Sequence, residues 1–366
     1  DGLEVYPVSD IEQLCRCLCG QQEIAPLPFD PMLLLDGGNR FTEDLCEVRG
    51  QGFAKRALEI AAAGGHNLLL IGPPGTGKSM LAKRLPTILP KLSFEEAIQT
   101  TRIYSVAGML PPDHPIMNTR PFRSPHHTVS PAGLTGGGSS PVPGEISLAH
   151  NGVLFLDELP EFQRQSLEVL RQPIEDSCVT ISRAASRVTY PCSMMFVAAM
   201  NPCPCGYRGH PSIACTCSEN AVQRYISKIS GPLLDRIDLH VEVAPVQFHD
   251  LTGSSTEESS AVVRARVEKA RKLQQERFAG EPFHCNARIP AGKLQQYCPL
   301  SGEALEFLRR SFESLGMTAR AYDRVVKVAR TIADLAGEET IGRTQIAEAL
   351  AYRTLDQKYW YENRNC

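Results

Sequence analysis

The segment Gly72–Ser79 contains the residue types and the spacing that bind a nucleoside triphosphate. It reads Gly-Pro-Pro-Gly-Thr-Gly-Lys-Ser, which matches the P-loop motif. Its glycines let backbone N–H groups point at phosphate oxygens, its lysine neutralises those oxygens, and its serine hydroxyl ligates Mg²⁺. The sequence therefore predicts a site for ATP and Mg²⁺. The predicted ATP-binding residues are those of this segment, Gly72, Pro73, Pro74, Gly75, Thr76, Gly77, Lys78 and Ser79, together with the next residue, Met80.

Two consecutive carboxylates follow a second apolar run, residues 152–156. Asp157 is predicted to hold Mg²⁺ through water beside Ser79, and Glu158 to polarise the water that attacks the triphosphate. The alternative is an acidic cap on a strand, without chemistry.

Three further residues are candidates for contact with the γ-phosphate. Asn201 ends a third apolar run, where its amide can reach the phosphate or orient the attacking water. Arg236 and Arg320 carry guanidinium groups that can stabilise charge in the transition state. The alternatives are a turn-forming asparagine and arginines that are solvated or paired with carboxylates. The predicted catalytic residues are Glu158, Asn201 and Arg236.

Four cysteines directly after Asn201 form two closely spaced pairs, Cys203 with Cys205 and Cys215 with Cys217. Two thiol pairs on a loop rich in proline and glycine suit a tetrahedral Zn²⁺ ion. We expect a structural zinc that braces the loop locally; free thiols and a disulfide are the alternatives. For the adjacent residues His126 and His127 we expect structural roles, because neighbouring histidines do not easily point at one ion.

Short apolar runs alternate with helical patterns from residue 33 to residue 247. This alternation predicts an α/β fold, in which helices cover both faces of a parallel sheet. The expected core strands are 67–71, 152–156 and 194–199. The P-loop follows the first of these and precedes a helical pattern over 80–85, which is the strand–loop–helix context that the motif requires.

A stretch rich in Ser, Thr, Gly and Glu then separates this region from one with helical periodicity. We expect a small all-helical domain there, with helices at 261–278, 302–315, 319–335 and 344–355. The expected domain division is a tail or linker over 1–32, an ATPase domain over 33–247, a linker over 248–260 and a helical lid over 261–366.

The composition fits a folded protein and limits the classes of partner. Of 366 residues, 42% are hydrophobic and 22% are charged, which is typical of globular domains. The net charge is −3, so any nucleic-acid surface must be local. No apolar stretch reaches the roughly 18 residues of a membrane span. Thirteen cysteines without a recognisable signal peptide favour the reducing cytoplasm. Because the chain begins at Asp1 without a methionine, we expect a fragment or processed form that lacks an N-terminal part.

Over roughly residues 30–356 the sequence resembles the ComM/YifB family, the magnesium chelatase-like AAA+ ATPases of the helix-2-insert clade, in several longer segments. The similar phrases are Leu35–Asn39, Gly64–Gly72, Pro121–His127, Pro143–Gly152 and Arg330–Leu335. The resemblance implies that Asp157 and Glu158 are the metal-holding and water-activating pair and that Asn201 is sensor one.

For the two arginines, the resemblance implies that Arg236 is a finger reaching a neighbouring subunit and that Arg320 is the ATP-binding sensor two. A finger that acts on a neighbour implies a homo-oligomeric ring, which we expect to be a hexamer. Residues 44–51 resemble the segment that lies against adenine. Residues 1–32 would lead from an N-terminal domain similar to Lon protease and ribosomal S5, which the family carries and this chain lacks.

The resemblance also implies a motor that acts on single-stranded or branched DNA, in recombination or natural transformation. Two insertions are candidates to face a pore, the tract 136–143 and a hairpin-like segment over 179–191. Arg183 and Arg187 flank the turn of the hairpin, where they suit phosphate contact; the alternative is a solvated hairpin tip. Two other functions remain open, an ATPase subunit of a magnesium chelatase and a nucleotide-gated protein remodeller.

Overall fold

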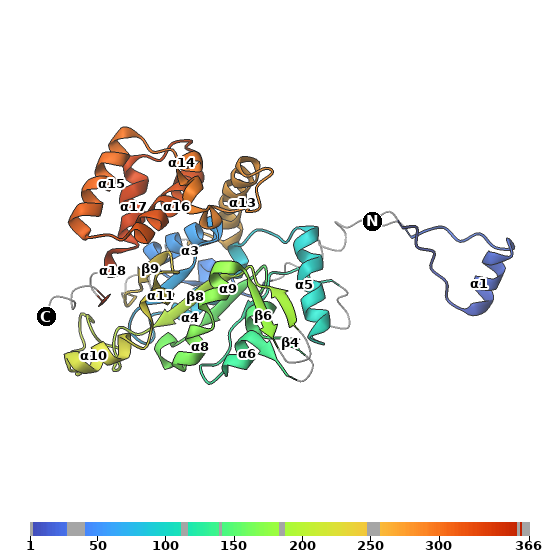
Figure 1. Ribbon diagram of the computed structural model, residues 1–366, viewed down its shortest axis with the longest axis horizontal. Helices are drawn as coiled ribbons and strands as arrows, with labels where there is room; N and C mark the ends of the chain where they lie inside the picture. The colour runs from blue at the N-terminus through green and yellow to red at the C-terminus, as the bar shows by residue number, and fades with distance from the viewer. Residues whose placement is uncertain are drawn as a thin grey trace.

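A computed structural model describes residues 3–27, 41–110, 116–138, 141–182, 187–246, 257–356 and 359–360. Its centre is a five-stranded sheet with the strand order β2-β5-β8-β1-β9, in which every pair is parallel (Figure 1). The predicted α/β fold class is therefore confirmed. The strands are β1 (Leu68–Ile71), β2 (Phe122–Arg123), β5 (Val153–Leu156), β8 (Met195–Met200) and β9 (Leu239–Glu242).

The central strands are apolar on both faces because helices cover both faces. Leu68 and Leu70 of β1 pack in one apolar cluster with α3 (Gly52–Gly64) and α4 (Lys78–Ile88). Leu69 and Ile71 point the other way, into a second cluster. That cluster includes residues of α8 (Arg164–Glu168), α9 (Arg171–Asp176) and α10 (Glu219–Ile226).

The parallel arrangement brings the chemical motifs to one edge of the sheet. The P-loop follows β1, Asp157 and Glu158 follow β5, and Asn201 follows β8. Since the carboxyl ends of parallel strands lie at the same edge, these segments meet there. Gly65, Asn67 and Asp238 precede β1 and β9 and therefore lie at the opposite, amino edge.

Two small hairpins form sheets of their own beside the central sheet, and they contact each other. The first is β3 (Gly136–Gly137) with β4 (Val142–Pro143), and the second is β6 (Cys178–Ser182) with β7 (Arg187–Pro191). The hydroxyl of Tyr190 donates a hydrogen bond to the carbonyl oxygen of Pro141 at 2.8 Å. The predicted hairpin and the predicted interruption between α6 (Pro131–Thr135) and α7 (Glu145–Leu148) are thus both present.

The C-terminal part is helical, and its first long helix packs along α3. Gln274 Nε2 and Arg271 Nη2 of α13 (Ser260–Arg277) each donate to a carbonyl at the end of α3, at 3.0 Å. The helix expected over 344–355 is divided into α17 (Arg343–Ala351) and α18 (Thr354–Asp356). The other long helices of this part are α15 (Gly302–Leu315) and α16 (Ala319–Ala336).

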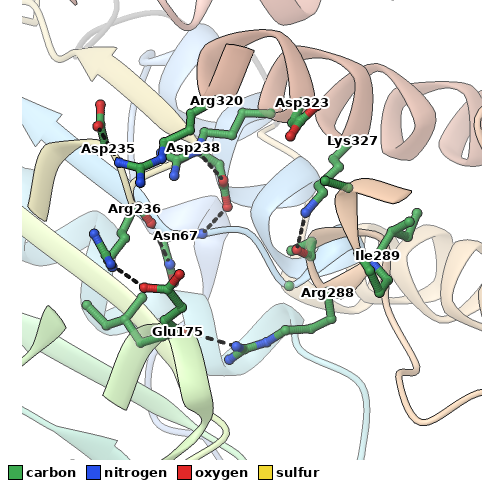
Figure 2. A pocket seen from close by; sticks show the side chains of 16 residues that line it. Asn67, Glu175, Asp235, Arg236, Asp238, Arg288, Ile289, Arg320, Asp323 and Lys327 are labelled. Carbon is green, nitrogen blue, oxygen red and sulfur yellow. Dashed lines mark hydrogen bonds and ion pairs between the residues drawn. The ribbon is translucent and has the colours of Figure 1, made fainter. Parts of the chain in front are cut away.

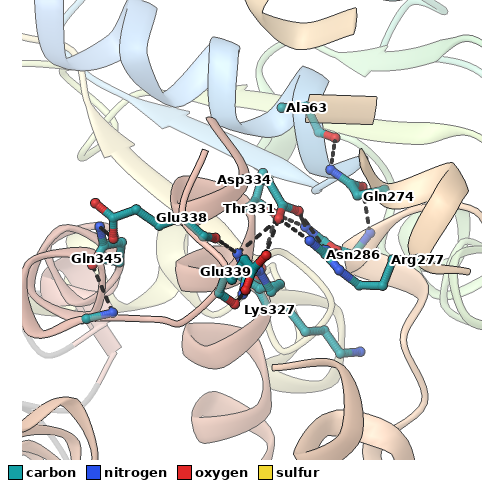
Figure 3. A network of polar contacts seen from close by, with 12 residues as sticks. Ala63, Gln274, Arg277, Asn286, Lys327, Thr331, Asp334, Glu338, Glu339 and Gln345 are labelled. Atoms are coloured by element: carbon teal, nitrogen blue, oxygen red, sulfur yellow. Dashed lines mark hydrogen bonds and ion pairs between the residues drawn. The ribbon is translucent and has the colours of Figure 1, made fainter. Parts of the chain in front are cut away.

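A buried polar network fixes α16 to α13 (Figure 3). The Asp334 carboxylate, whose side chain is fully buried, accepts from Arg277 at 2.5 Å and from the Asn286 amide at 2.7 Å. The same amide donates to the Thr331 hydroxyl at 3.0 Å. Each partner of the buried carboxylate is thus a donor, which is how a buried charge is tolerated.

Among the described helices, none combines the length and the apolarity that a bilayer span requires. Helix α1 buries none of its residues. The remaining elements are α1 (Ile11–Leu18), η1 (Leu45–Glu47), α5 (Phe94–Val106), η2 (Leu159–Glu161), α11 (Gly231–Leu234), η3 (Asn286–Arg288), η4 (Ala291–Lys293) and α14 (Leu294–Tyr297).

Candidate functional site

The P-loop is wrapped around the ammonium group of Lys78. Gly75 and Gly77 have φ angles of 76° and 86°, a region that favours glycine, and they turn the chain from β1 into α4. Lys78 Nζ donates to the carbonyl oxygens of Gly72 and Pro73, both at 2.7 Å. The loop thus has the closed shape in which its backbone N–H groups can face an anion.

Asn201 lies beside the same ammonium group. Its Oδ1 accepts a hydrogen bond from Lys78 Nζ at 3.2 Å. Burial lowers the pKa of Lys78, and the nearby carboxylates of Asp157 and Glu158 oppose that shift. Among the described residues, the direct hydrogen-bond partners of this cation are two carbonyls and an amide, all neutral, so a bound phosphate would give it a charged partner in direct contact.

Ser79 and Asp157 form an oxygen-rich corner next to Lys78. The Ser79 hydroxyl donates to Asp157 Oδ2 at 2.5 Å, and the Glu158 N–H donates to Asp157 Oδ1 at 2.9 Å. A hydroxyl and a carboxylate side by side are the oxygen ligands that Mg²⁺ takes in nucleotide sites. These two residues therefore fit the metal that a triphosphate brings.

Glu158 has an unusual backbone and an unpredicted neighbour. Its φ is 53°, in the left-handed region, which costs on the order of 1 kcal/mol for a residue with a side chain. Its Oε2 lies 3.5 Å from Nδ1 of His127. His127 follows β2, the strand next to β5, so the sheet order brings it to the carboxylate. The structural role expected for His127 did not include this contact with Glu158.

Arg236 and Arg320 both line a cavity of about 380 Å³ (Figure 2). Arg236 forms an ion pair with Glu175, and Arg320 Nη1 lies 3.4 Å from Asp235 Oδ2. Asn67 and Asp238 line the same cavity, so it opens at the amino edge of the sheet. The structure thus brings the two arginines together, but it does not bring them to Lys78 within one chain.

A second cavity, of about 440 Å³, adjoins the beginning of the P-loop. Gly72 and Pro73 form one side, and Ala244, which follows β9, also lines it. Gln51 Nε2 donates to the carbonyl oxygen of Ala244 at 2.5 Å, which places the end of segment 44–51 beside this cavity. A volume of this size is in the ordinary range for a small-molecule pocket.

The remaining predicted contacts lie elsewhere. Met80 is 45% exposed on α4 and lines neither cavity. Arg187 is exposed at the start of β7, paired in register with Ser182. Arg183 and the phrase 35–39 fall outside the described residues.

The four predicted metal ligands come together. The Sγ atoms of Cys203, Cys205 and Cys215 are 3.4 to 3.6 Å apart, and those of all four cysteines, with Cys217, lie within 4.8 Å of one another. Two short-spaced pairs from the ends of one loop therefore form a single thiol cluster, which could hold a metal ion.

Comparison with known proteins relates both parts of the chain to one family. The family model described as magnesium chelatase, subunit ChlI, matches residues 44–251, and the model described as its C-terminal part matches residues 257–353. The chain is 46% identical to YifB of Salmonella typhimurium over 86% of this chain and 61% of that protein. It is 47% identical to the competence protein ComM of Haemophilus influenzae over 86% of this chain and 60% of that protein.

A more distant relative is the DNA replication licensing factor Mcm2 of Drosophila melanogaster. It is 27% identical over 52% of this chain and 20% of that protein. The chain spans about 60% of the length of the two bacterial relatives.

Proposed function

The chain belongs to the ComM/YifB family of magnesium chelatase-like AAA+ ATPases, and from this membership we propose that it is the ATP-hydrolysing part of a ring motor that acts on DNA. The observation that carries the proposal is the convergence of Lys78, Ser79, Asp157 and Asn201 at one edge of the sheet. The chain covers only part of its relatives, so the activity proposed is that of the whole protein.

Each residue of the convergence has a distinct task. The P-loop and Lys78 would bind the β- and γ-phosphates, and Ser79 and Asp157 would hold the Mg²⁺ that neutralises their charge. Glu158 accepts a proton from the attacking water, which Asn201 helps to orient. ATP bound here would occupy the cavity beside Gly72, with its base toward segment 44–51.

The position of the two arginines supports a ring of identical subunits. Arg236 and Arg320 lie at the amino edge of the sheet, whereas the P-loop lies at the carboxyl edge. A guanidinium at that edge reaches the γ-phosphate only if the ATP is held by an adjacent copy. Closed cyclic symmetry satisfies every such head-to-tail contact, and we propose a hexamer.

The two contacting hairpins are the proposed DNA surface. Arg187, and Arg183 beyond the described residues, give the second hairpin positive charge in a chain whose net charge is −3. Arg120 and Arg123, which precede the first hairpin in the sequence, are not free for DNA in the same way, because they pair with Glu96 and Glu145. The names of two relatives, a competence protein and a replication licensing factor, point the same way. Single-stranded or branched DNA is the substrate that we propose.

The deciding experiment measures ATP hydrolysis by the whole protein with and without branched DNA. We expect DNA to stimulate hydrolysis, and Glu158→Gln to bind ATP while losing hydrolysis and strand movement. Arg187→Ala should reduce the slope of log affinity against log salt by about 0.7 to 0.9, the value of one phosphate contact. The control is Arg309→Ala, which removes an exposed arginine of α15. Hydrolysis that is indifferent to DNA would count against the proposal.

A second candidate, metal insertion, is favoured by the two family models, whose descriptions name a magnesium chelatase subunit. In that case hydrolysis would respond to partner chelatase subunits and not to DNA. The same assay, with those subunits in place of DNA, separates the two functions.

We further propose that residues 33–247 form the ATPase domain and 261–366 the helical lid, joined by 248–260, and that the protein works in the cytoplasm. Its cofactors are ATP and Mg²⁺. We assign to the four cysteines a Zn²⁺ ion that takes no part in hydrolysis.

A further inference from the structure

The loop that carries the four cysteines, Cys203–Cys217, lies directly against the nucleotide site. It begins two residues after Asn201, so its first ligand is almost adjacent to the residue that contacts Lys78. Gly206 has a φ of 86°, and a Cβ atom there would lie 2.6 Å from Cδ of Pro74. Only a glycine lets the loop backbone come this close to the P-loop.

The same loop also forms a wall of the cavity beside the P-loop. Its residues Arg208 to Ser212 line that cavity together with Gly72, Pro73 and Ala244. The segment 208–212 lies between the second and third cysteines in sequence, so the cluster anchors the chain on both sides of it. An ion that holds the four cysteines together therefore also holds this wall of the cavity in place.

The cluster has the donors and the spacing of a closed tetrahedral metal site. With Zn–S bonds of about 2.3 Å, tetrahedral sulfur atoms are about 3.8 Å apart. The sulfurs of Cys203, Cys205 and Cys215 are 3.4 to 3.6 Å apart, and that of Cys217 lies within 4.8 Å of each. Two backbone N–H groups point at the sulfurs, Cys205 N at Cys217 Sγ (3.3 Å) and Arg208 N at Cys203 Sγ (3.4 Å). Such donors stabilise thiolates that bind a metal.

The donor set also selects the metal. Four soft sulfur ligands favour Zn²⁺ over Mg²⁺ or Ca²⁺. The other metal centre that a tetrahedral S₄ site accepts is an iron–sulfur centre. Four protein ligands leave no open position on the ion, so the site is structural and carries out no chemistry of its own.

We propose that Zn²⁺ bound by Cys203, Cys205, Cys215 and Cys217 holds the loop against Pro74 and Asn201 and thereby sets the affinity of the nucleotide site. This inference rests on the proposed ATP site but not on DNA. Loss of the ion frees the segment 208–212, and the cavity then has to be reordered each time a nucleotide binds.

The first test is the metal content of the full chain purified without chelators. We expect one zinc per chain and no iron. Replacement by Co²⁺ should give the visible absorption of a tetrahedral cobalt–thiolate site, and Cys215→Ser with Cys217→Ser should abolish it. Cys178→Ser, which changes a partly buried cysteine of β6 outside the cluster, should leave both results unchanged. Wild-type protein that contains iron, or well under one zinc per chain, would overturn the assignment.

The second test is the affinity for a fluorescent ATP analogue with Mg²⁺, in the absence of DNA. We expect the double serine variant to bind about tenfold more weakly, because binding must then order the loop. Wild-type protein stripped of zinc should show the same loss and regain affinity when zinc is restored, a comparison that does not depend on how the variant folds.

The outcomes separate this proposal from the one on function. Equal affinity with and without zinc would refute the coupling even if DNA stimulated hydrolysis. If the affinity for nucleotide depended on zinc but DNA did not stimulate hydrolysis, the coupling would be supported and the proposed motor activity on DNA would be refuted.

Discussion

His127 Nδ1 lies 3.5 Å from Glu158 Oε2, at the ends of two neighbouring strands of the sheet. Glu158 is the proposed base of the hydrolysis reaction, and its side chain is 58% exposed. An imidazole at this distance restricts the orientations open to the carboxylate. The base must leave that contact, or turn within it, when it meets the attacking water.

Replacing His127 by alanine should therefore raise basal hydrolysis. The expected increase is at most about fivefold, because an exposed pair of this kind contributes ~0–1 kcal/mol. The measurement is the steady-state ATPase rate without DNA. His126→Ala is the matched control, since the His126 ring lies tilted against His127 but its Nδ1 lies 3.0 Å from the Thr128 hydroxyl. A tenfold fall in rate would instead make His127 a residue that positions the base.

The corner formed by Ser79 and Asp157 predicts a metal-specific defect. Asp157→Asn should weaken binding of ATP with Mg²⁺ by about 10- to 100-fold, the range seen when even an outer partner of a metal is lost. Binding without Mg²⁺ should change little, because Lys78 and the P-loop remain. Titration of a fluorescent nucleotide with and without Mg²⁺ measures both. The control is Glu161→Gln, which changes an exposed acidic residue of η2 and should bind nucleotide like the wild type. If Asp157→Asn lost the same affinity with and without Mg²⁺, the metal would have to bind elsewhere.

Three of the five strands were predictable from the sequence, and the reason is burial. A strand covered on both faces is a continuous apolar run, as in β1, β5 and β8. The strand β2 has only two residues, and β9 contains His240 and Glu242, which interrupt its apolar pattern. The order of the strands depends on contacts between distant segments, which a local pattern does not contain.

The same distinction applies to the site. The P-loop and the pair Asp157 and Glu158 are local motifs, and the parallel sheet was enough to predict that they converge. His127 was missed because its contact depends on β2 lying beside β5. The position of Arg320 depends on how α16 packs against the amino edge of the sheet, where Arg324 of the same helix lies 3.8 Å from Asp238. The sequence therefore predicted an arginine near ATP but not the edge at which it lies.

A buried histidine predicts that the protein loses stability in mild acid. Burial lowers the pKa of His150 from its ordinary value of 6.5 to about 4. Its Nδ1 accepts from the Ser193 N–H at 3.0 Å, which requires an unprotonated ring nitrogen. Between about pH 6.5 and about pH 4 the unfolded chain binds a proton that the folded chain does not, so folding stability falls as pH falls through this range.

The expected loss from this group is about 2 kcal/mol between neutral pH and pH 5. Denaturant unfolding of the wild type and of His150→Gln, which keeps a hydrogen-bond acceptor, should show a shallower pH dependence in the variant. The same slope in both proteins would show that other groups cause the acid sensitivity.

The separation of Arg236 from Lys78 predicts that two inactive variants restore each other. Lys78→Ala destroys the phosphate site but leaves an intact arginine, and Arg236→Ala does the reverse. If each active site is shared between adjacent copies, a mixture contains interfaces where an intact P-loop meets an intact arginine. With random assembly of equal amounts, about one quarter of the interfaces are complete, so the mixture should hydrolyse ATP at about one quarter of the wild-type rate.

A mixture of Lys78→Ala with Glu158→Gln should stay inactive, because both residues belong to the same chain's half of the site. Failure of the first mixture to recover activity, in rings shown to exchange subunits, would mean that Arg236 acts within its own chain, and the cavity it shares with Arg320 would then have to rearrange on binding ATP.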